Sequence, residues 1–182
     1  MFCVQLAGVL VAVEARYAFT ERLCADYIID VSPNECDFAV SATPEEIAAE
    51  NDEGAFSPAY CESLALYRKI CTRMLEYEAF LFHAAVISYA GRGFAFAAKS
   101  GTGKSTHIAQ WMCALGDNVT VVNGDRRIVR WESGEGLAAD ASGGQPSGAF
   151  IAYGTPYNGK EGWGQNASVP LRAVCFIERC QP

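Results

Sequence analysis

The sequence predicts one domain of the α/β class that tends towards α+β, and three observations support this. Its 182 residues suit one domain rather than two of ordinary size. Hydrophobic residues make up 51% and charged residues 19%, which provides enough apolar surface for a core and excludes wholesale disorder. Strand-like and helix-like segments both occur, without internal repeats. We expect a single domain over residues 1–182, with looser strands and a short helix over 1–56 and a core over 57–182.

The charge balance limits the classes of partner. Fourteen Lys and Arg residues against 21 Asp and Glu residues give a formal net charge of −7. Nucleic-acid-binding proteins carry the opposite sign, so a DNA or RNA partner is not expected, whereas a local anion site stays open. Residues 6–13 are apolar, but no Lys or Arg precedes them and they are too short to span a membrane. They predict a buried strand and no membrane association.

Eight cysteines are many for this length, yet no two of them form a Cys-x-x-Cys pair. That spacing argues against a zinc ribbon or finger. Because the composition builds a core without disulfides, we interpret them as reduced thiols of a cytoplasmic protein, with a secreted disulfide framework as the alternative. They lie at positions 3, 24, 36, 61, 71, 113, 175 and 180.

The first part of the chain predicts strands. Residues 2–19 are mostly β-branched, aromatic or small, which favours one long strand or a hairpin bent near Gly8. Residues 27–31 and 38–40 predict two further strands.

Helix-start signals follow at two places. Thr43 can cap the amides of a short helix, Pro44 suits its first turn, and Glu46 completes a capping box. Ser57 and Pro58 open a longer helix. Five residues on one face of that helix are expected to pack in the core: Tyr60, Leu64, Tyr67, Cys71 and Met74.

The second half predicts strands around one helix. Residues 84–89 and 94–98 predict two strands joined by a hairpin-like turn at 90–93. Further strands are expected at 119–123, 128–131 and 173–177. Residues 133–148 contain five glycines and little apolar sequence, which predicts a mobile loop. The helix after residue 98 has an expected inner stripe of Ile108, Trp111, Met112 and Leu115.

The strongest functional signal is the loop Lys99-Ser100-Gly101-Thr102-Gly103-Lys104-Ser105-Thr106. A strand, such a loop and a helix form the setting of a phosphate-binding loop. Small residues let backbone N–H groups face a phosphate, and the helix N-terminus adds its positive dipole end. Lys104 can reach the β- and γ-phosphates, and the Ser105 hydroxyl can ligate Mg²⁺. The predicted phosphate-binding residues are Ser100, Gly101, Thr102, Gly103, Lys104, Ser105 and Thr106.

One residue of this loop departs from the generic pattern. Ala98 stands where the pattern has glycine. Alanine can occupy the position if its φ is negative. The alternative interpretation is a Gly/Ser turn with an incidental lysine.

A carboxylate and a histidine complete the set of candidates. A nucleoside triphosphate with Mg²⁺ requires a carboxylate at the end of a neighbouring strand, to hold the metal or take a proton. Asp125 fits because it follows the strand at 119–123, and the alternative is a simple turn aspartate. His83 precedes the strand at 84–89, and the sequence is equally compatible with a structural and a catalytic function for it. His107, in the first turn of the helix, is expected to pack or cap locally.

A third cluster spans residues 153–162 and is rich in glycine, aromatic and hydroxyl groups. Its Lys160 is a candidate anion ligand for the bound nucleotide. The alternative is a surface turn followed by a loop.

Several short motifs follow one another along the chain, each occurring once: His83-Ala84-Ala85, residues 98–107, Trp111, Asn123-Gly124-Asp125, Tyr153-Gly154-Thr155-Pro156, Gly159-Lys160-Glu161 and Val169-Pro170-Leu171. As an ordered series they resemble the HPr kinase and phosphoenolpyruvate-carboxykinase-like superfamily. The sequence looks most like a small bacterial branch often labelled ATP-type phosphoenolpyruvate carboxykinase. The resemblance is firm from residue 57 onwards and looser before it, and that branch tolerates alanine at the first loop glycine.

The resemblance implies a mixed, strongly twisted sheet with a P-loop, in a fold distinct from Ras-like and RecA-like NTPases. Carried onto this chain, it implies that Lys104 binds phosphates, that Ser105 binds Mg²⁺, and that Asp125 binds the metal or takes the substrate hydroxyl's proton. His83 would lie at the active-site edge. The implied ligands are ATP or GTP with Mg²⁺, the implied acceptor is a small protein or peptide, and an oligomer is left open.

Two departures from the family bear on activity. HPr kinases typically have two adjacent aspartates where this chain has Gly124-Asp125, so one carboxylate is missing. Family members also continue into a helical portion beyond the strand that ends near residue 177, so the chain is expected to be C-terminally truncated.

Three functions follow as hypotheses. The first is a kinase that transfers the γ-phosphoryl group to a serine of a small protein or peptide. The second is a nucleotide-binding regulatory or vestigial module without turnover, which the single aspartate favours. The third is carboxykinase chemistry on oxaloacetate, although the chain has little room for a substrate lobe. The nearby arginines for that third reaction are Arg126, Arg127, Arg130 and Arg172.

Overall fold

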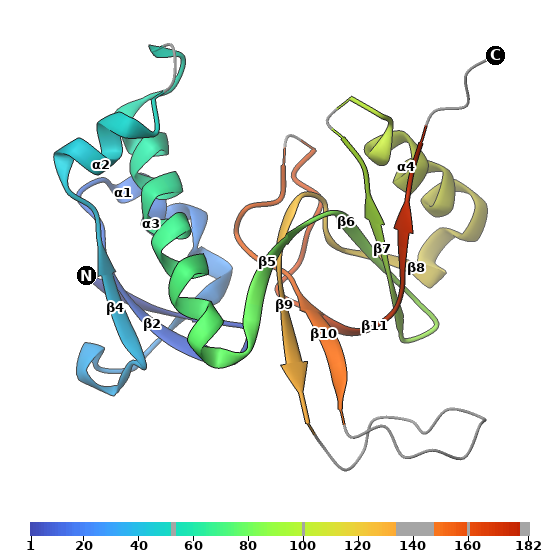
Figure 1. Ribbon diagram of the computed structural model, residues 1–182, viewed down its shortest axis with the longest axis horizontal. Coiled ribbons are helices and arrows are strands. Elements are labelled where there is room, and N and C mark those ends of the chain that lie inside the picture. Colours follow the sequence, from blue (N-terminus) through green and yellow to red (C-terminus); the bar gives the residue numbers. More distant parts are fainter. Residues whose placement is uncertain (52–53, 100, 134–147, 160, 179–182) are drawn as a thin grey trace. The chain divides into compact units, whose positions relative to one another are not determined.

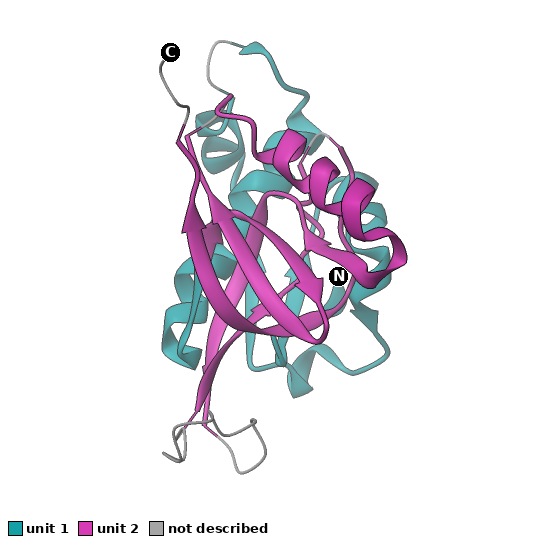
Figure 2. Ribbon diagram, turned by 90° about the vertical axis from the view of Figure 1, so that its right-hand side faces the viewer, with its two compact units in different colours: residues 1–80 teal, residues 81–182 magenta. Residues whose placement is uncertain are grey.

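The computed structural model describes residues 1–51, 54–99, 101–133, 148–159 and 161–178 (Figure 1). Within these ranges, helices combine with sheets that mix parallel and antiparallel strands, which confirms the expected α+β character. The chain divides into two compact units, Met1–Phe80 and Leu81–Pro182 (Figure 2). No helix in the described ranges is both long and apolar enough to cross a membrane.

Unit 1 (Met1–Phe80) contains a four-stranded sheet in the order β3-β1-β2-β4. β1 (Phe2–Leu6) and β2 (Val9–Glu14) form an antiparallel hairpin around Ala7 and Gly8, whose φ angles are 50° and 76°. Two successive positive φ angles are typical of a type I′ turn, so the predicted hairpin bend near Gly8 is confirmed. The sheet is completed by β3 (Ile28–Ile29), antiparallel to β1, and β4 (Phe38–Ser41), parallel to β2.

Three α-helices complete unit 1: α1 (Ala18–Leu23), α2 (Pro44–Ala49) and α3 (Pro58–Met74). The capping box predicted for α2 is confirmed, because the side chains of Thr43 and Glu46 each accept a hydrogen bond from the other's backbone N–H. Ser57 caps α3 by accepting from the Tyr60 N–H. α3 packs against α1, α2 and β4.

α1 depends on a buried carboxylate from another helix. Its N-cap residue, Tyr17, makes no side-chain capping bond. Instead, the fully buried Glu62 of α3 accepts hydrogen bonds from the backbone N–H groups of Arg16 at 2.7 Å and Tyr17 at 3.0 Å, and from Thr20 Oγ1 at 3.4 Å. The expected strand over residues 2–19 is therefore wrong beyond Glu14, because the helix-start signal comes from a residue 45 positions away.

The buried face of α3 is also rotated from the expected one. Tyr67 and Met74 are buried as expected, whereas the other three expected residues are only partly buried. Glu62, Leu66 and Ile70 are buried in their place. The rotation follows from the burial of Glu62, which apolar periodicity assigns to the polar face.

Unit 2 (Leu81–Pro182) is built on a seven-stranded mixed sheet in the order β5-β9-β10-β11-β7-β6-β8, of which β5 begins at Ala79, just before the unit boundary. β6 and β7 form a hairpin whose two turn residues, Ala90 and Gly91, have φ angles of 50° and 71°. β11 pairs in parallel with β7 and antiparallel with β10. The strands are β5 (Ala79–His83), β6 (Ala85–Tyr89), β7 (Arg92–Ala97), β8 (Val119–Asn123), β9 (Arg126–Glu132), β10 (Ala149–Tyr153) and β11 (Ser168–Phe176).

The sequence located most of these strands and missed two. β6, β7 and β8 lie where expected, and β9 and β11 extend beyond their expected bounds. β5 and β10 were not expected, because each is only five residues long and a short apolar segment does not identify a strand by its periodicity. The expected mobile loop at 133–148 lies, apart from its two end residues, outside the described residues.

The sheet of unit 2 carries a packed cluster on each face. α4 (Lys104–Leu115) lies on one face, where its Ile108 packs with Ile87, Phe96 and Val121. Trp111 and Leu115 pack there as expected, but Met112 is 38% exposed, so that part of the expected stripe is wrong.

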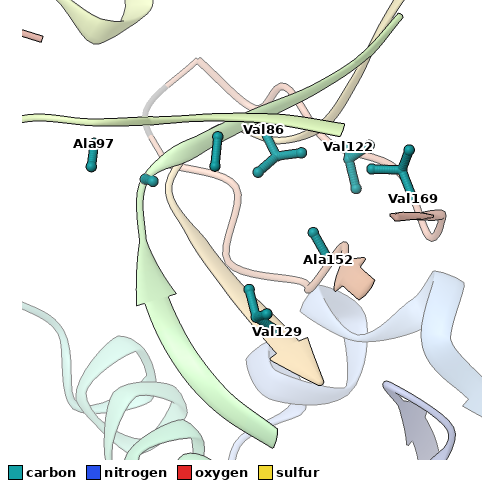
Figure 3. Close-up of a cluster of buried hydrophobic side chains, with 8 residues drawn as sticks. Val86, Ala97, Val122, Val129, Ala152 and Val169 are labelled. Carbon is teal, nitrogen blue, oxygen red and sulfur yellow. The ribbon is translucent and has the colours of Figure 1, made fainter. Parts of the chain in front are cut away.

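On the other face, the sheet curls so that distant strands face each other. Figure 3 shows Val86 of β6 and Val122 of β8 on the opposite side of the cluster from Val129 of β9 and Ala152 of β10. Four of the eight buried residues of this cluster are alanines, which lets the two halves of the sheet approach closely. The curl brings β9 and its neighbours around towards β8.

The cysteines form no disulfide within the described residues. Burial raises the pKa of the Cys24 thiol to about 12, so this thiol stays protonated at neutral pH.

Candidate functional site

One edge of the unit 2 sheet collects three of the predicted functional segments. β6 runs antiparallel between β7 and β8, with Ala85 opposite Phe96 and Val86 opposite Asn123. The end of β7, the end of β8 and the start of β6 therefore lie at the same edge. The phosphate-loop candidate leaves β7 there, Asp125 follows β8, and His83 precedes β6. β11 ends at this edge too, since the Ile177 N–H donates to the Ala97 carbonyl at 2.9 Å.

The backbone of the predicted phosphate loop has the conformation that its glycines permit. Gly101 and Gly103 have φ angles of 75° and 113°. A Cβ atom at either position would meet nothing within 4 Å, so glycine is favoured by the left-handed backbone and not by lack of space. Ala98 is not among the residues with positive φ, which is the condition under which alanine fits this position. Ser100 lies outside the described residues.

Gly103 is the N-cap of α4, and no side chain caps that terminus. The first turn of α4 consists of Lys104, Ser105 and Thr106 and carries no acidic residue. A helix N-terminus of this kind can bind an anion through its N–H groups and its positive dipole end. The Lys104 side chain folds back over the loop, where Nζ donates to the Ala98 carbonyl at 3.1 Å. A bound phosphate would compete for this ammonium group.

His83 and Asp125, which the sequence proposed separately, form a direct pair. His83 Nε2 lies 2.7 Å from Asp125 Oδ1. The side chains are 57% and 30% exposed, so both remain accessible to a ligand. Arg126 Nε lies 3.8 Å from the second carboxylate oxygen, Oδ2. The two oxygens of the Asp125 carboxylate therefore face different groups, an imidazole at Oδ1 and a guanidinium at Oδ2.

Buried polar groups hold Asp125 in its turn. The fully buried Asn123 accepts the Asp125 N–H through Oδ1 at 2.8 Å. The Gly124 N–H donates to the Trp163 carbonyl at 2.9 Å, and the buried Arg127 donates through Nη2 to the Asp125 carbonyl at 3.1 Å. Because the backbone of residues 124 and 125 is fixed on several sides, the direction of the carboxylate is set by the fold.

The third predicted cluster packs against this turn. Asn123 Nδ2 donates to the carbonyl of Thr155 at 3.2 Å and to Asn158 Oδ1 at 2.9 Å. Thr155 is fully buried and its hydroxyl donates to the Arg126 carbonyl. At Gly159, whose φ is 78°, a Cβ atom would come within 3.0 Å of Asp125 Cβ. Lys160, the candidate anion ligand, lies outside the described residues.

Tyr153, at the other end of the cluster, joins two neighbouring strands of the sheet. The Tyr153 hydroxyl donates to Glu132 Oε1 between β10 and β9. Burial and this hydrogen bond raise the pKa of Tyr153 to about 12. Tyr153 is therefore a neutral, structural group at physiological pH.

The sequence motifs contain Asn123 and Thr155, but no function was assigned to either, although they connect the Asp125 turn to the segment after β10. An amide that ends a strand before Gly-Asp is a typical turn-forming residue. That local signal predicts the hydrogen bond to Asp125 but not the partner at residue 155, because their contact spans 32 positions.

His107 packs locally, as expected. Its Nε2 accepts a hydrogen bond from Trp111 Nε1 at 3.1 Å, one helical turn later. The ring also packs edge-to-face on Phe96, with ring centroids 4.7 Å apart. These contacts fix the start of α4 against the sheet.

The residues at this edge fit a hard divalent cation when nucleotide is bound. The Ser105 hydroxyl and the Asp125 carboxylate are oxygen donors, the ligand type that Mg²⁺ prefers, and phosphates and water complete its shell. The described residues contain no group of three or more His, Cys, Asp or Glu side chains that could hold a metal without a ligand. Ser105 and Asp125 are therefore the residues of this edge that could hold Mg²⁺ together with a phosphate.

No protein-family model matches this chain, and no curated protein matches it.

Proposed function

We propose that unit 2 binds ATP or GTP with Mg²⁺ and transfers the γ-phosphoryl group to a serine of a small protein or peptide. One observation carries the proposal: the glycine loop that opens α4 and the His83–Asp125 pair leave the same sheet edge. Phosphoryl transfer needs little more from a protein than positioning and charge neutralisation. The same observation supports a fold related to the HPr kinases.

In this proposal, the loop and the uncapped first turn of α4 hold the phosphates. Lys104 exchanges the Ala98 carbonyl for a phosphate oxygen, since its Nζ already lies over the loop. Ser105 and Asp125 would hold Mg²⁺, which neutralises phosphate charge when bound. Asp125 takes the proton of the acceptor hydroxyl, and His83 orients its carboxylate through the 2.7 Å contact.

A test begins with calorimetry of ATP and GTP binding in the presence of Mg²⁺. The wild-type chain is expected to bind one nucleotide, and Lys104→Ala is expected to weaken binding strongly. Lys99→Ala is the matched control, because Lys99 is an exposed lysine of the same loop and is expected to leave binding unchanged. Absence of binding by the wild-type chain would overturn the proposal.

Transfer is then measured with radiolabelled ATP and lysate of the source organism. A labelled acceptor is expected with the wild-type chain and not with Lys104→Ala. Binding without transfer would favour the second candidate, a nucleotide-binding module without turnover, which the presence of Gly124 in place of a second aspartate supports.

The structure offers less to carboxykinase chemistry. That reaction needs arginines that reach a dicarboxylate substrate, and Arg127, one of the four candidates, is fully buried and donates to the Asp125 carbonyl. Phosphoryl transfer to a hydroxyl is therefore the function that this edge supports best.

A further inference from the structure

The last part of β11 has a backbone edge that no described strand covers. β10 pairs only with residues 168–170 of β11, whereas β7 pairs with its later residues up to Phe176. Figure 1 shows β11 curving away from β10, so that its end lies beside β7. We propose that this edge, residues 172–178, pairs antiparallel with the same edge of a second copy, so that the chain forms a symmetric dimer through β11. The inference concerns assembly and does not rest on the proposed nucleotide site.

The pairing with β7 determines which backbone groups point to the open edge. The Ile177 N–H donates to the Ala97 carbonyl, which follows the last paired residues of β7 and β11. Successive residues of a strand direct their N–H and C=O groups to opposite sides, so Val174 and Phe176 direct theirs away from β7. Neither residue has a hydrogen-bonding partner on that side among the described parts of the chain. An edge of this kind is a template for another strand.

The side chains along this edge place two apolar residues between two opposite charges. Val174 and Phe176 are 45% and 78% exposed, and Phe176 is the most exposed of the large hydrophobic side chains in the described ranges. The alternate residues Cys175 and Ile177 pack instead in the cluster under α4. Arg172 and Glu178, two residues to either side of the apolar pair, are exposed. Exposed apolar side chains beside an open backbone edge are typical of an interface.

Only one register makes this edge complementary to itself. Two-fold registers that bring both apolar residues into the contact are centred on residue 174, 175 or 176. Centred on Cys175, the pairing places Val174 opposite the partner's Phe176, where the two residues exchange backbone hydrogen bonds. It also places Arg172 opposite the partner's Glu178. The other two centres place Arg172 opposite Phe176 or Val174 opposite Glu178, so charge complementarity selects the register at residue 175.

The symmetry of this pairing also limits the assembly to two copies. Each chain uses the same edge that its partner uses, so the contact closes on itself and leaves no open end of β11 for a third chain. One strand pair is small compared with a standard protein interface, and we therefore expect a dissociation constant of about 10–100 µM.

Sedimentation equilibrium of the full chain, across concentrations on both sides of that value, tests the proposal. Phe176→Asp is expected to raise the dissociation constant at least about tenfold, because it places charge in both apolar pairs. Phe150→Asp, at a 46% exposed phenylalanine of β10, is the matched control and should leave the constant unchanged. Circular dichroism confirms that each variant is folded.

A charge exchange tests the register. Arg172→Glu is expected to weaken the dimer about tenfold, because it places like charges opposite each other twice. Combining it with Glu178→Arg should restore the wild-type constant, whereas Arg92→Glu, at an exposed arginine of β7, should have no effect. A double variant that stays as weak as Arg172→Glu would overturn the register.

Cys175 gives a direct measure of proximity. In the proposed register the two Cys175 residues form a pair without backbone hydrogen bonds, with Cα atoms about 4.5 Å apart, which is within the range of a disulfide. Diamide oxidises the two thiols by taking up their two electrons and two protons. Mass spectrometry of the digested dimer should then find a peptide linked through Cys175 of both chains.

Two results would overturn the inference. One is a chain that stays monomeric at every concentration, which would leave the edge of β11 to a strand of another protein. The other is a dimer whose dissociation constant neither Phe176→Asp nor Arg172→Glu changes. Nucleotide binding is measured separately by calorimetry, so this inference and the proposed function fail independently.

Discussion

The two units use their charged side chains in opposite ways. Unit 1 contains five Lys and Arg residues against 14 Asp and Glu residues, a formal charge of −9, whereas unit 2 contains nine against seven, a formal charge of +2. In unit 1 ion pairs stabilise helices, such as Lys69–Glu46 at 2.7 Å, which joins α3 to α2, and Arg73–Glu76 at 2.8 Å, at the end of α3. In unit 2 the pair His83–Asp125 stands at a sheet edge beside a phosphate-loop candidate. The acidity of the whole chain is therefore the acidity of unit 1.

The carboxylates of Glu62 and Asp125 illustrate this difference between the units. Glu62 in unit 1 is fully buried, and its oxygens accept two backbone N–H groups and a hydroxyl. Asp125 in unit 2 is 30% exposed, and its oxygens face an imidazole and, at longer range, a guanidinium. A buried carboxylate whose oxygens accept from backbone and hydroxyl donors stabilises a fold, while a partly exposed one beside an imidazole is accessible to a ligand. Burial and partner type, more than residue type, separate the two functions.

The largest expected effect is on activity and comes from Asp125→Asn. The variant keeps an oxygen for His83 but removes the charge, so transfer should fall about 1,000-fold while the free energy of unfolding changes by about 0.5 kcal/mol or less. Turnover with labelled ATP and urea denaturation measure the two effects. A variant that unfolds readily would place Asp125 with Glu62 as a structural carboxylate and so break the comparison.

Glu62→Leu should do the converse of Asp125→Asn: it should lower stability and leave nucleotide binding unchanged. Two backbone N–H groups and the Thr20 hydroxyl would lose their buried acceptor, so the free energy of unfolding should fall by about 3 kcal/mol. Glu62→Gln, which keeps one acceptor oxygen, should lose less. Glu21→Gln, an exposed change of the same charge in α1, is the control and should stay within about 0.5 kcal/mol. Urea denaturation gives these values, and nucleotide binding per folded molecule should be unchanged.

Asn123→Ala should lower both the free energy of unfolding and the rate of phosphoryl transfer. It removes the acceptor of the Asp125 N–H and the donor to Thr155 and Asn158, at a cost of about 2 kcal/mol in unfolding free energy, and transfer should also fall. Asn123→Asp keeps the acceptor and removes the donor. If Asn123→Asp restores transfer but not stability, Asn123 positions Asp125 and holds the neighbouring segment through separate bonds. Equal losses in both variants would contradict this division.

Gly103→Ala should weaken nucleotide binding by about tenfold, because the left-handed backbone at φ 113° costs an L-residue roughly 1–2 kcal/mol. Ala98→Gly is the matched change at the other end of the loop and should leave affinity nearly unaltered, since Ala98 does not have positive φ. Calorimetry with ATP and Mg²⁺ compares the two. Equal affinities for both variants would argue against a phosphate loop.

The smallest effect is expected at the surface of unit 1. Arg68 Nε lies 2.6 Å from Glu50 Oε1, yet the arginine side chain is 73% exposed. Arg68→Ala should therefore lower the free energy of unfolding by about 0.5 kcal/mol, and added salt should reduce the difference. A loss of unfolding free energy as large as that of Glu62→Leu, measured in the same denaturant series, would mean that exposure does not predict how much a charged side chain of this unit contributes to stability.

Local signals predicted the elements that depend on neighbouring residues. The capping box at Thr43 and Glu46, the turn at Gly8 and the strands around the glycine loop are all encoded within a few positions. α1 was missed because its capping group is Glu62 of another helix, and β10 because five apolar residues do not identify a strand on their own. A long-range contact thus explains the error at α1, and a short, ambiguous local signal explains the error at β10.

The α+β class and the candidate site residues could be predicted from the chain alone, because composition, periodicity and the spacing of the glycine loop are local properties. Which of those residues meet depends on the tertiary structure. His83 and Asp125 are 42 positions apart, and they pair because β6 runs antiparallel between β7 and β8. The contact of His107 with Trp111, four residues later in the same helix, was by contrast expected from the sequence. Strand order, which joins distant segments at one edge, is the physical reason why His83 and Asp125 meet.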